Sequence, residues 1–156
     1  MKIKKKHTIL RDTSEQRPLE FHGFNIRARA CNLDYGDYRM RFLDGEVSST
    51  VFERKSVPDL FGSLTKGHDR FMREIKRAHE DSATLVIIVE GNLGKVAKGT
   101  RHSKVQGISI IRTLFSLWVR YGVVPVFAKD RREASEFIIQ YYMAEWRKKT
   151  EEQHGK

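Results

Sequence analysis

Apolar and polar residues alternate in the first third of the chain, which is the pattern of half-buried β-strands, whose successive side chains point to opposite faces. The clearest case is YRMRFL, residues 38–43, in which apolar residues alternate with two arginines. Further extended segments are expected at 7–11, 24–33 and 47–55, and HTILR (7–11) is expected at the edge of the sheet. The Asp44-Gly45 pair is a strong turn signal, so 38–43 and 47–55 should form an antiparallel hairpin.

From residue 56 onward, apolar residues recur at helical spacing. Helices are expected over 56–80, with a break at Gly67, and over 104–121 and 131–149. Two more strands lie between them: the continuous apolar run 83–91 is typical of a strand covered on both faces, and Pro125 favours an edge position for 123–128. Residues 92–103 are rich in glycine and lysine and are expected to form a loop.

Strands come first, and helices then alternate with strands, which predicts a mixed central β-sheet flanked by helices on both faces. A chain of 156 residues is about the size of one domain. We therefore expect a single α/β domain over 1–156, with a core at about 8–145 and basic, frayed termini.

The chain has 30 Lys and Arg against 20 Asp and Glu, a net charge of +10, which favours a polyanionic partner. No apolar run approaches the roughly 18 residues of a membrane-spanning helix, and the start MKIKKKHTIL lacks the features of a signal peptide. We expect no membrane association and an intracellular location, cytoplasmic or nucleoid-associated. The single cysteine, Cys31, excludes an internal disulfide and is expected to be a small buried side chain.

The acidic residues near predicted strand ends are the strongest candidates for chemistry. If the hairpin forms through its Asp44-Gly45 turn, Asp37 falls roughly opposite Glu53. A hard cation such as Mg²⁺ takes oxygen ligands and only one or two carboxylates from the protein. Asp37 and Glu53 are therefore the expected metal ligands.

Lys55 follows Glu53 by two residues, so the two side chains share one face of the strand. Lys55 could act as a base if a neighbouring cation or burial lowered its pKa from about 10.4, or it could stay charged and hold the attacking water. The residues alone leave both roles open. Arg54 points to the opposite face, where we expect it to brace the site or to pair with an acid.

The motif residues resemble a known family. Gly-Asp at 36–37, fifteen residues, Glu-Arg-Lys at 53–55, three residues and then Asp59 resemble the GDXnERKXXXD signature of XPF-type nucleases, including the archaeal Hef proteins. The upstream DTSEQ (12–16) resembles the D-x-R-E segment of that family. The resemblance covers about residues 8–145 and implies a restriction-endonuclease-like fold that cuts DNA with Mg²⁺ or Mn²⁺.

The resemblance implies a catalytic set that comprises Asp12, Glu15, Asp37, Glu53, Arg54, Lys55 and Asp59. Some of these residues have a second reading: 56–59 is a capping-box pattern, so Asp59 serves equally well as a helix cap, and Asp12 and Glu15 would otherwise be loop residues. Ser14 and His68 replace arginines common in the family, which affects substrate choice or rate more than reaction class. The chain also leaves no room for the paired helix-hairpin-helix domain of many relatives.

Basic residues near the expected site are candidates for DNA-backbone contacts: Lys66, Arg70, Lys95, Lys98, Arg101 and Lys104. The 91–104 segment leaves the end of a central strand, where open α/β sheets tend to place ligands. For the helix that carries Arg70, a solvated face is as good an interpretation as a phosphate track. The aromatic residues of the last helix are expected in the core or at a dimer contact.

The leading hypothesis is a metal-dependent DNA endonuclease that acts on branched, flapped or single-strand-containing DNA, as a homodimer or with a protein partner that supplies specificity. The alternative is a non-catalytic DNA-binding accessory module on the same fold. The intact set of Asp37, Glu53 and Lys55 argues against it, because binding alone needs no metal ligands. A basic structural protein of a nucleoprotein assembly is a third reading, which rests on charge alone.

Overall fold

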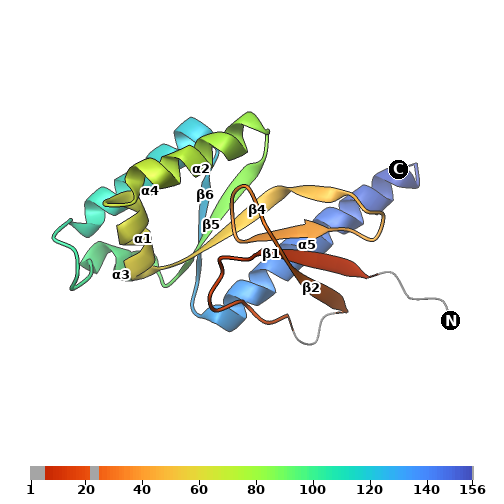
Figure 1. Ribbon diagram of the computed structural model, residues 1–156, viewed down its shortest axis with the longest axis horizontal. Coiled ribbons are helices and arrows are strands. Elements are labelled where there is room, and N and C mark those ends of the chain that lie inside the picture. Colours follow the sequence, from red (N-terminus) through yellow and green to blue (C-terminus); the bar gives the residue numbers. More distant parts are fainter. Residues whose placement is uncertain (1–5, 22–24, 156) are drawn as a thin grey trace.

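The computed structural model describes residues 6–21 and 25–155. Six strands form one mixed sheet in the order β2-β1-β3-β4-β5-β6, and helices cover both of its faces (Figure 1). The predicted α/β fold is therefore confirmed. The strands are β1 His7–Asp12, β2 Ile26–Cys31, β3 Tyr38–Arg41, β4 Val47–Ser56, β5 Thr84–Glu90 and β6 Val124–Ala128. The helices are α1 Val57–Leu64, α2 His68–Glu80, α3 Leu93–Lys98, α4 Gly107–Tyr121 and α5 Arg131–Gln153.

The β3–β4 hairpin forms as predicted, with Tyr38 paired to Phe52 in antiparallel register, but its register shifts between Arg39 and Arg41, which was not predicted. Its turn is closed by the Phe42 amide, which donates to the Glu46 carbonyl at 2.8 Å. Gly45 has φ +89°, a left-handed conformation that glycine adopts without a steric cost. Strands β4, β5 and β6 run parallel, so their carboxyl ends lie at one edge of the sheet.

Two apolar layers hold the helices to the sheet. Helices α1, α2 and α4 pack on one face, where Leu60, Ile75 and Leu114 meet side chains of β4 and β5. Helix α5 packs on the other face, and its Tyr142 is fully buried and donates to the Thr50 carbonyl at 2.7 Å. None of the helices in the described residues is long and apolar enough to cross a membrane.

The placement of two strands at the sheet edge was predicted, and one of these predictions is wrong. Strand β6, which contains Pro125, is at an edge as expected, whereas β1 lies between β2 and β3. Strand β2 pairs with β1 in parallel and takes the edge, while Ile9 of β1 is fully buried. Residue 24, the expected start of β2, and the basic residues 1–5 lie outside the described residues.

The segment 92–103 is not entirely a loop, because it contains the short helix α3. The Asn92 side chain caps this helix by accepting from the Lys95 amide at 2.8 Å, and Val96 is fully buried. The many glycines and lysines of this segment favoured a loop prediction, although Asn92 and Val96 are features of a helix. Cys31 is half-buried rather than buried, because it ends the edge strand β2.

Candidate active site

An open cavity of about 1030 Å³ lies where the hairpin, the loop after β1 and helices α1 and α2 meet. Its lining includes Asp37, Glu53 and Lys55 together with side chains from α2. The site is thus assembled from segments that are far apart in the sequence, and the pairing of β3 with β4 holds its centre.

Asp37 is fixed by the backbone around it. Its amide donates to the Phe52 carbonyl at 2.7 Å and its carbonyl accepts from the Asp12 amide at 2.8 Å. The amide of Arg54 donates to Asp37 Oδ2 at 2.8 Å. Gly36 before it has φ +75°, and a Cβ there would lie 2.2 Å from Val51 Cγ1, so only glycine allows this approach. These bonds extend the hairpin register by one residue and bring Asp37 opposite Glu53.

Glu53 and Lys55 lie side by side on β4, as their spacing predicts. Glu53 is 6% exposed, and Lys55 Nζ lies 3.0 Å from Glu53 Oε1. The ammonium group also lies 5.3 Å from the centroid of the Phe71 ring, which is a cation–π distance. Lys55 is therefore held at the cavity by a carboxylate and an aromatic face.

The carboxylates of the site carry an electrostatic cost in the metal-free chain. Burial raises the pKa of Asp37 to about 7, against the Arg54 amide that favours its ionised form. Burial, followed by the charge of Asp37, raises the pKa of Glu53 well above its usual range. Each carboxylate thus holds its proton more tightly than a solvated one, and a cation between them would relieve this cost.

The pKa of Lys55 is raised, whereas a general base at neutral pH requires a lowered pKa. Burial works to lower its pKa, but the charges of Glu53, Asp37 and Glu74 outweigh burial and raise it. The residues alone left a lowered and an ordinary pKa open. In the metal-free chain Lys55 is a charged group.

The donor set of Asp37 and Glu53 fits a hard divalent cation. Asp37 Oδ1 and Glu53 Oε2 receive no hydrogen bond from the described residues, whereas the other oxygen of each carboxylate is engaged. Within the described ranges, no three side chains of His, Cys, Asp or Glu are grouped closely enough to hold an ion by themselves. Mg²⁺ commonly takes one or two carboxylates and completes its shell with water and substrate phosphate, so this sparse set suits it.

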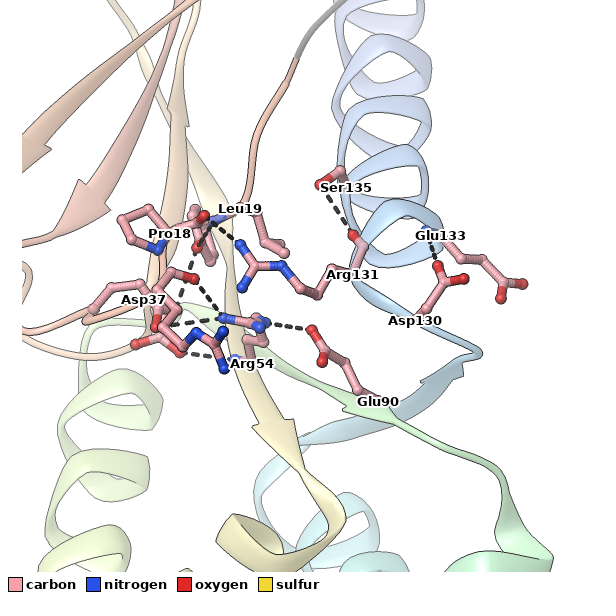
Figure 2. Close-up of polar contacts among 12 residues, drawn as sticks. Pro18, Leu19, Asp37, Arg54, Glu90, Asp130, Arg131, Glu133 and Ser135 are labelled. Atoms are coloured by element: carbon pink, nitrogen blue, oxygen red, sulfur yellow. Dashed lines mark hydrogen bonds and ion pairs between the residues drawn. The ribbon is translucent and has the colours of Figure 1, made fainter.

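Arg54 points to the other side of β4 and pairs with two acids. Its Nε contacts Glu90 Oε1 of β5 (Figure 2). Its Nη1 lies 3.5 Å from Glu15 Oε1. Nη1 also donates to the Arg17 carbonyl at 2.8 Å, and Arg131 of α5 donates to the neighbouring Pro18 carbonyl at 2.8 Å. The two arginines therefore tie the loop after β1 to the sheet and to α5.

Asp12 is used to shape the loop after β1. Its Oδ1 accepts from the Leu33 amide at 2.8 Å, and its Oδ2 accepts from the Ser14 amide at 3.0 Å and from the Ser14 hydroxyl. Burial acts to raise the pKa of Asp12, but these hydrogen bonds outweigh it and lower the pKa. Ser14, which replaces the arginine of the family pattern, thus serves as a partner of Asp12.

Glu15 and Asp59 lie at the wall and the rim of the cavity. Glu15 accepts from the Tyr38 hydroxyl at 3.2 Å and pairs with Arg54, so it belongs to the bracing network. The amide of Asp59 donates to the Ser56 side chain at 3.2 Å, which is the N-cap bond of α1. The Asp59 side chain is exposed, and no hydrogen bond or ion pair joins it to the other described residues of the site.

The predicted DNA-binding residues separate into two groups. Arg70 of α2 is exposed and lines the cavity, together with Arg73 of the next turn. Lys66 is exposed but is not part of the lining. The remaining four, Lys95, Lys98, Arg101 and Lys104, lie on α3 and the following loop, where a smaller hollow of about 400 Å³ is lined in part by Lys98 and Lys104.

Two acids of the site were missed from the sequence. Glu74 of α2 accepts from the Gly36 amide at 2.7 Å, and Glu90 ends β5 beside Arg54. Glu74 follows Phe71 by three residues and therefore lies on the inner face of α2, where a charged residue is unusual. This position on the helix could have indicated from the sequence that Glu74 belongs to the site. For Glu90, the only indication was its place at the end of a strand.

Comparison with known proteins agrees with this geometry. The model of the family described as ERCC4 domain matches residues 8–141. XPF from Aeropyrum pernix is similar in structure, with a TM-score of 0.65 and 24% identity over 84% of this chain and 57% of that one. XPF from Aeropyrum pernix in complex with DNA gives a TM-score of 0.66 and 23% identity over 86% and 62%. No curated protein sequence matches the chain significantly.

The chain spans less than two thirds of the length of these two solved structures, and at this identity the likeness establishes the fold. The family match covers most of the chain and includes the whole motif from Gly36 to Asp59. The resemblance to XPF-type nucleases is thereby confirmed, and the chain belongs to the ERCC4 domain family.

Proposed function

We propose that this ERCC4 domain is a metal-dependent DNA endonuclease. The observation that carries the proposal is the pair of buried carboxylates, Asp37 and Glu53, held opposite each other beside a charged Lys55 at the wall of an open cavity. Such a pair is costly for a binding module, which has no need of it. A nuclease uses it to hold Mg²⁺ or Mn²⁺ against a phosphodiester.

Asp37 and Glu53 would hold the ion, while the amide of Arg54 keeps Asp37 in place. The bound ion would supply Lewis acidity toward the scissile phosphate and the attacking water. Lys55, charged and anchored between Glu53 and Phe71, orients that water or stabilises negative charge on the phosphate as the bond breaks. In-line attack leaves a 5′-phosphate and a 3′-hydroxyl, as the family implies.

DNA is the proposed substrate, and its contacts begin on α2. Arg70 and Arg73 face the cavity, where a phosphate backbone entering the site would meet them. The net charge of +10 adds affinity that is independent of sequence. Following the resemblance to XPF-type nucleases, we propose branched, flapped or single-strand-containing DNA as substrate.

A second copy of the chain is the proposed protein partner. Helix α4 exposes Ile108, Phe115, Trp118 and Val119, and Val119 is 88% exposed. The rings of Phe115 and Trp118 stack with centroids 6.3 Å apart, so these two side chains form one apolar surface. Exposed apolar patches of this kind mark interaction surfaces. Sedimentation of the wild type and Val119→Glu tests this contact, because a charge at the most exposed residue of the patch should leave only monomer.

The test of the proposed function is cleavage by the purified chain. End-labelled single-stranded, duplex, flap and four-way-junction DNA would be incubated with Mg²⁺, Mn²⁺ or chelator, using wild type, Asp37→Asn and Lys55→Ala. Metal-dependent cleavage by the wild type and its loss in both variants is expected, while Lys55→Ala still binds the metal in calorimetry. DNA binding without cleavage in every metal would favour the accessory module, and turnover by Asp37→Asn would refute the ligand assignment.

A further inference from the structure

One face of the sheet carries four arginines that the site does not use. In β1 and β3, alternate residues such as Ile9 and Met40 point toward α5 and are buried, and Ile26 of β2 is partly buried against the same layer. The residues between them point to the opposite face. On that face the register forms two rows, Arg29-Leu10-Arg39 and Arg27-Thr8-Arg41. We call Arg27, Arg29, Arg39 and Arg41 the arginine face.

Helices leave this part of the sheet open. Helices α1, α2 and α4 pack over the half formed by β4, β5 and β6, on the same side as the arginine face. Helix α5 lies behind β1 and β2, and no helix is drawn in front of them (Figure 1). Arg27 and Arg29 are exposed, and Arg39 and Arg41 are half-buried.

The charges of the arginine face are uncompensated. No carboxylate in the part of the chain that the structure describes forms an ion pair with any of the four. Arg39 is held in place instead by its Nε, which donates to the Ser48 carbonyl at 2.7 Å, and by the Tyr35 ring 5.9 Å away. Arg27 and Arg29 of β2 are two residues apart on one face, as are Arg39 and Arg41 of β3, so the neighbouring guanidinium groups of each strand repel one another. An anionic ligand would offset the repulsion.

The arginine face adjoins the cavity. Strand β1 ends at Asp12, on the same face as Leu10, and β3 begins directly after Asp37. The row of Arg29 and Arg39 therefore lies two residues, about 7 Å, from the row of Asp12, and the row of Arg27 and Arg41 lies about 14 Å away. A chain of phosphates that leaves the site across β1 would meet one row and then the next.

We propose that the arginine face binds the phosphate backbone of the DNA segment that flanks the cleaved bond. The proposal rests on the proposed function and adds to it a surface beyond the cavity. A row spacing of about 7 Å corresponds to two phosphates of one strand, at about 3.4 Å of helix axis each. Guanidinium groups suit bidentate phosphate contacts, and a face that reaches only the backbone binds without regard to sequence.

The test measures DNA binding in chelator, where cleavage cannot interfere. Fluorescence anisotropy with a labelled duplex and a labelled flap would be recorded from 50 to 200 mM salt for wild type and for Arg27→Gln with Arg29→Gln, which keeps the aliphatic stems. The control, Arg147→Ala with Lys148→Ala, removes the same charge from exposed positions of α5, which covers the opposite face. Arg41→Gln on β3 is a second variant in case the edge strand is weakened, and thermal melts check folding.

Loss of two phosphate contacts should lower the salt slope by about 1.8, so that affinity falls about tenfold less between 50 and 200 mM salt than it does for wild type. Arg41→Gln should lower the slope by about 0.9, and the α5 control should match wild type. Slopes of both face variants equal to that of the control would overturn the proposal while leaving the nuclease intact. A wild type that binds no DNA in any salt would overturn the arginine face and the proposed function together.

Discussion

The two sides of β4 at the cavity differ in how their buried charges are balanced. On the side of Arg54, the guanidinium pairs with Glu15 and Glu90 and also donates to the Arg17 carbonyl, so each partner is satisfied. On the side of Glu53, a single lysine faces three acids, because Asp37 and Glu74 lie close enough to act on its pKa along with Glu53. Three consecutive motif residues thus serve two different environments.

The difference separates structural charge from functional charge. The paired network around Arg54 holds the loop after β1 in place without a ligand. The acids around Asp37 lack enough positive charge, so binding of a cation should raise the free energy of unfolding. Removing a charge should therefore destabilise the chain on the Arg54 side and stabilise it on the Asp37 side. The predictions below test this opposition, from the largest expected effect to the smallest.

Asp37→Asn should abolish cleavage, by at least about 10³-fold, and should raise the stability of the metal-free chain at pH 8. The pKa of Asp37 is raised from 3.8 to about 7, so its contribution to stability is most favourable below about pH 4 and is lost as pH rises through about 7. Asparagine keeps the oxygen that accepts from the Arg54 amide but carries no charge. A gain of about 1–2 kcal/mol, or about 2–8 °C in Tm, is expected at pH 8.

The same melts at pH 4 provide the control for Asp37→Asn. Wild-type Asp37 is protonated there, so the variant and the wild type should melt at nearly the same temperature. A variant that is less stable than wild type at pH 8 would mean that the carboxylate is compensated after all, and the contrast between the two sides of β4 would fail.

Arg54→Met should act in the opposite direction. The Arg54 side chain is only 13% exposed, and its loss leaves Glu15 and Glu90 without their common partner. A destabilisation of about 2–3 kcal/mol is expected in urea denaturation, below the value for a fully buried pair because some water reaches this network. Lys148→Met is the matched control, since Lys148 forms an exposed pair with Glu152 and should cost at most about 0.5 kcal/mol. Equal losses in the two variants would refute the bracing role.

Metal affinity should rise with pH through neutrality. The ion binds ionised carboxylates, and the pKa of Asp37 is about 7, so the proton competes with the metal below that pH. The ionised fraction of such a group rises about tenfold between pH 6 and pH 8, and the raised pKa of Glu53 adds to the effect. Calorimetric titration of Mn²⁺ at pH 6, 7 and 8 measures this directly. A pH-independent Kd would show that the pair is already ionised in the free chain.

Local patterns in the sequence indicated the hairpin that carries Asp37 and Glu53. The turn at Asp44-Gly45 and the alternation in 38–43 predict its two strands, but the position of Asp37 opposite Glu53 also depends on a register shift between Arg39 and Arg41 that these patterns do not indicate. The hairpin was predictable because both strands and their turn are neighbours in the chain.

Features that depend on distant segments were not predictable in this way. The interior position of β1 depends on β2 pairing outside it, and an apolar run of five residues fits an interior strand and an edge strand equally well. Glu74 and Glu90 reach the site only because α2 and β5 pack against the hairpin. In the sequence they are two of 20 acidic residues.

Glu74→Gln should give the smallest effect of these changes, and it tests whether the charge of Glu74 contributes to metal binding. Glutamine keeps the oxygen that accepts from the Gly36 amide at 2.7 Å, so the turn that orients Asp37 survives while the third negative charge is lost. Weaker Mn²⁺ binding, by about three- to tenfold, is expected with little change in Tm, and Glu80→Gln at an exposed position of the same helix should change neither. If Glu74→Ala alone weakens metal binding and Glu74→Gln does not, then Glu74 acts through the hydrogen bond to Gly36 and its charge is incidental. That outcome would leave Asp37 and Glu53 as the whole of the uncompensated charge on this side of β4.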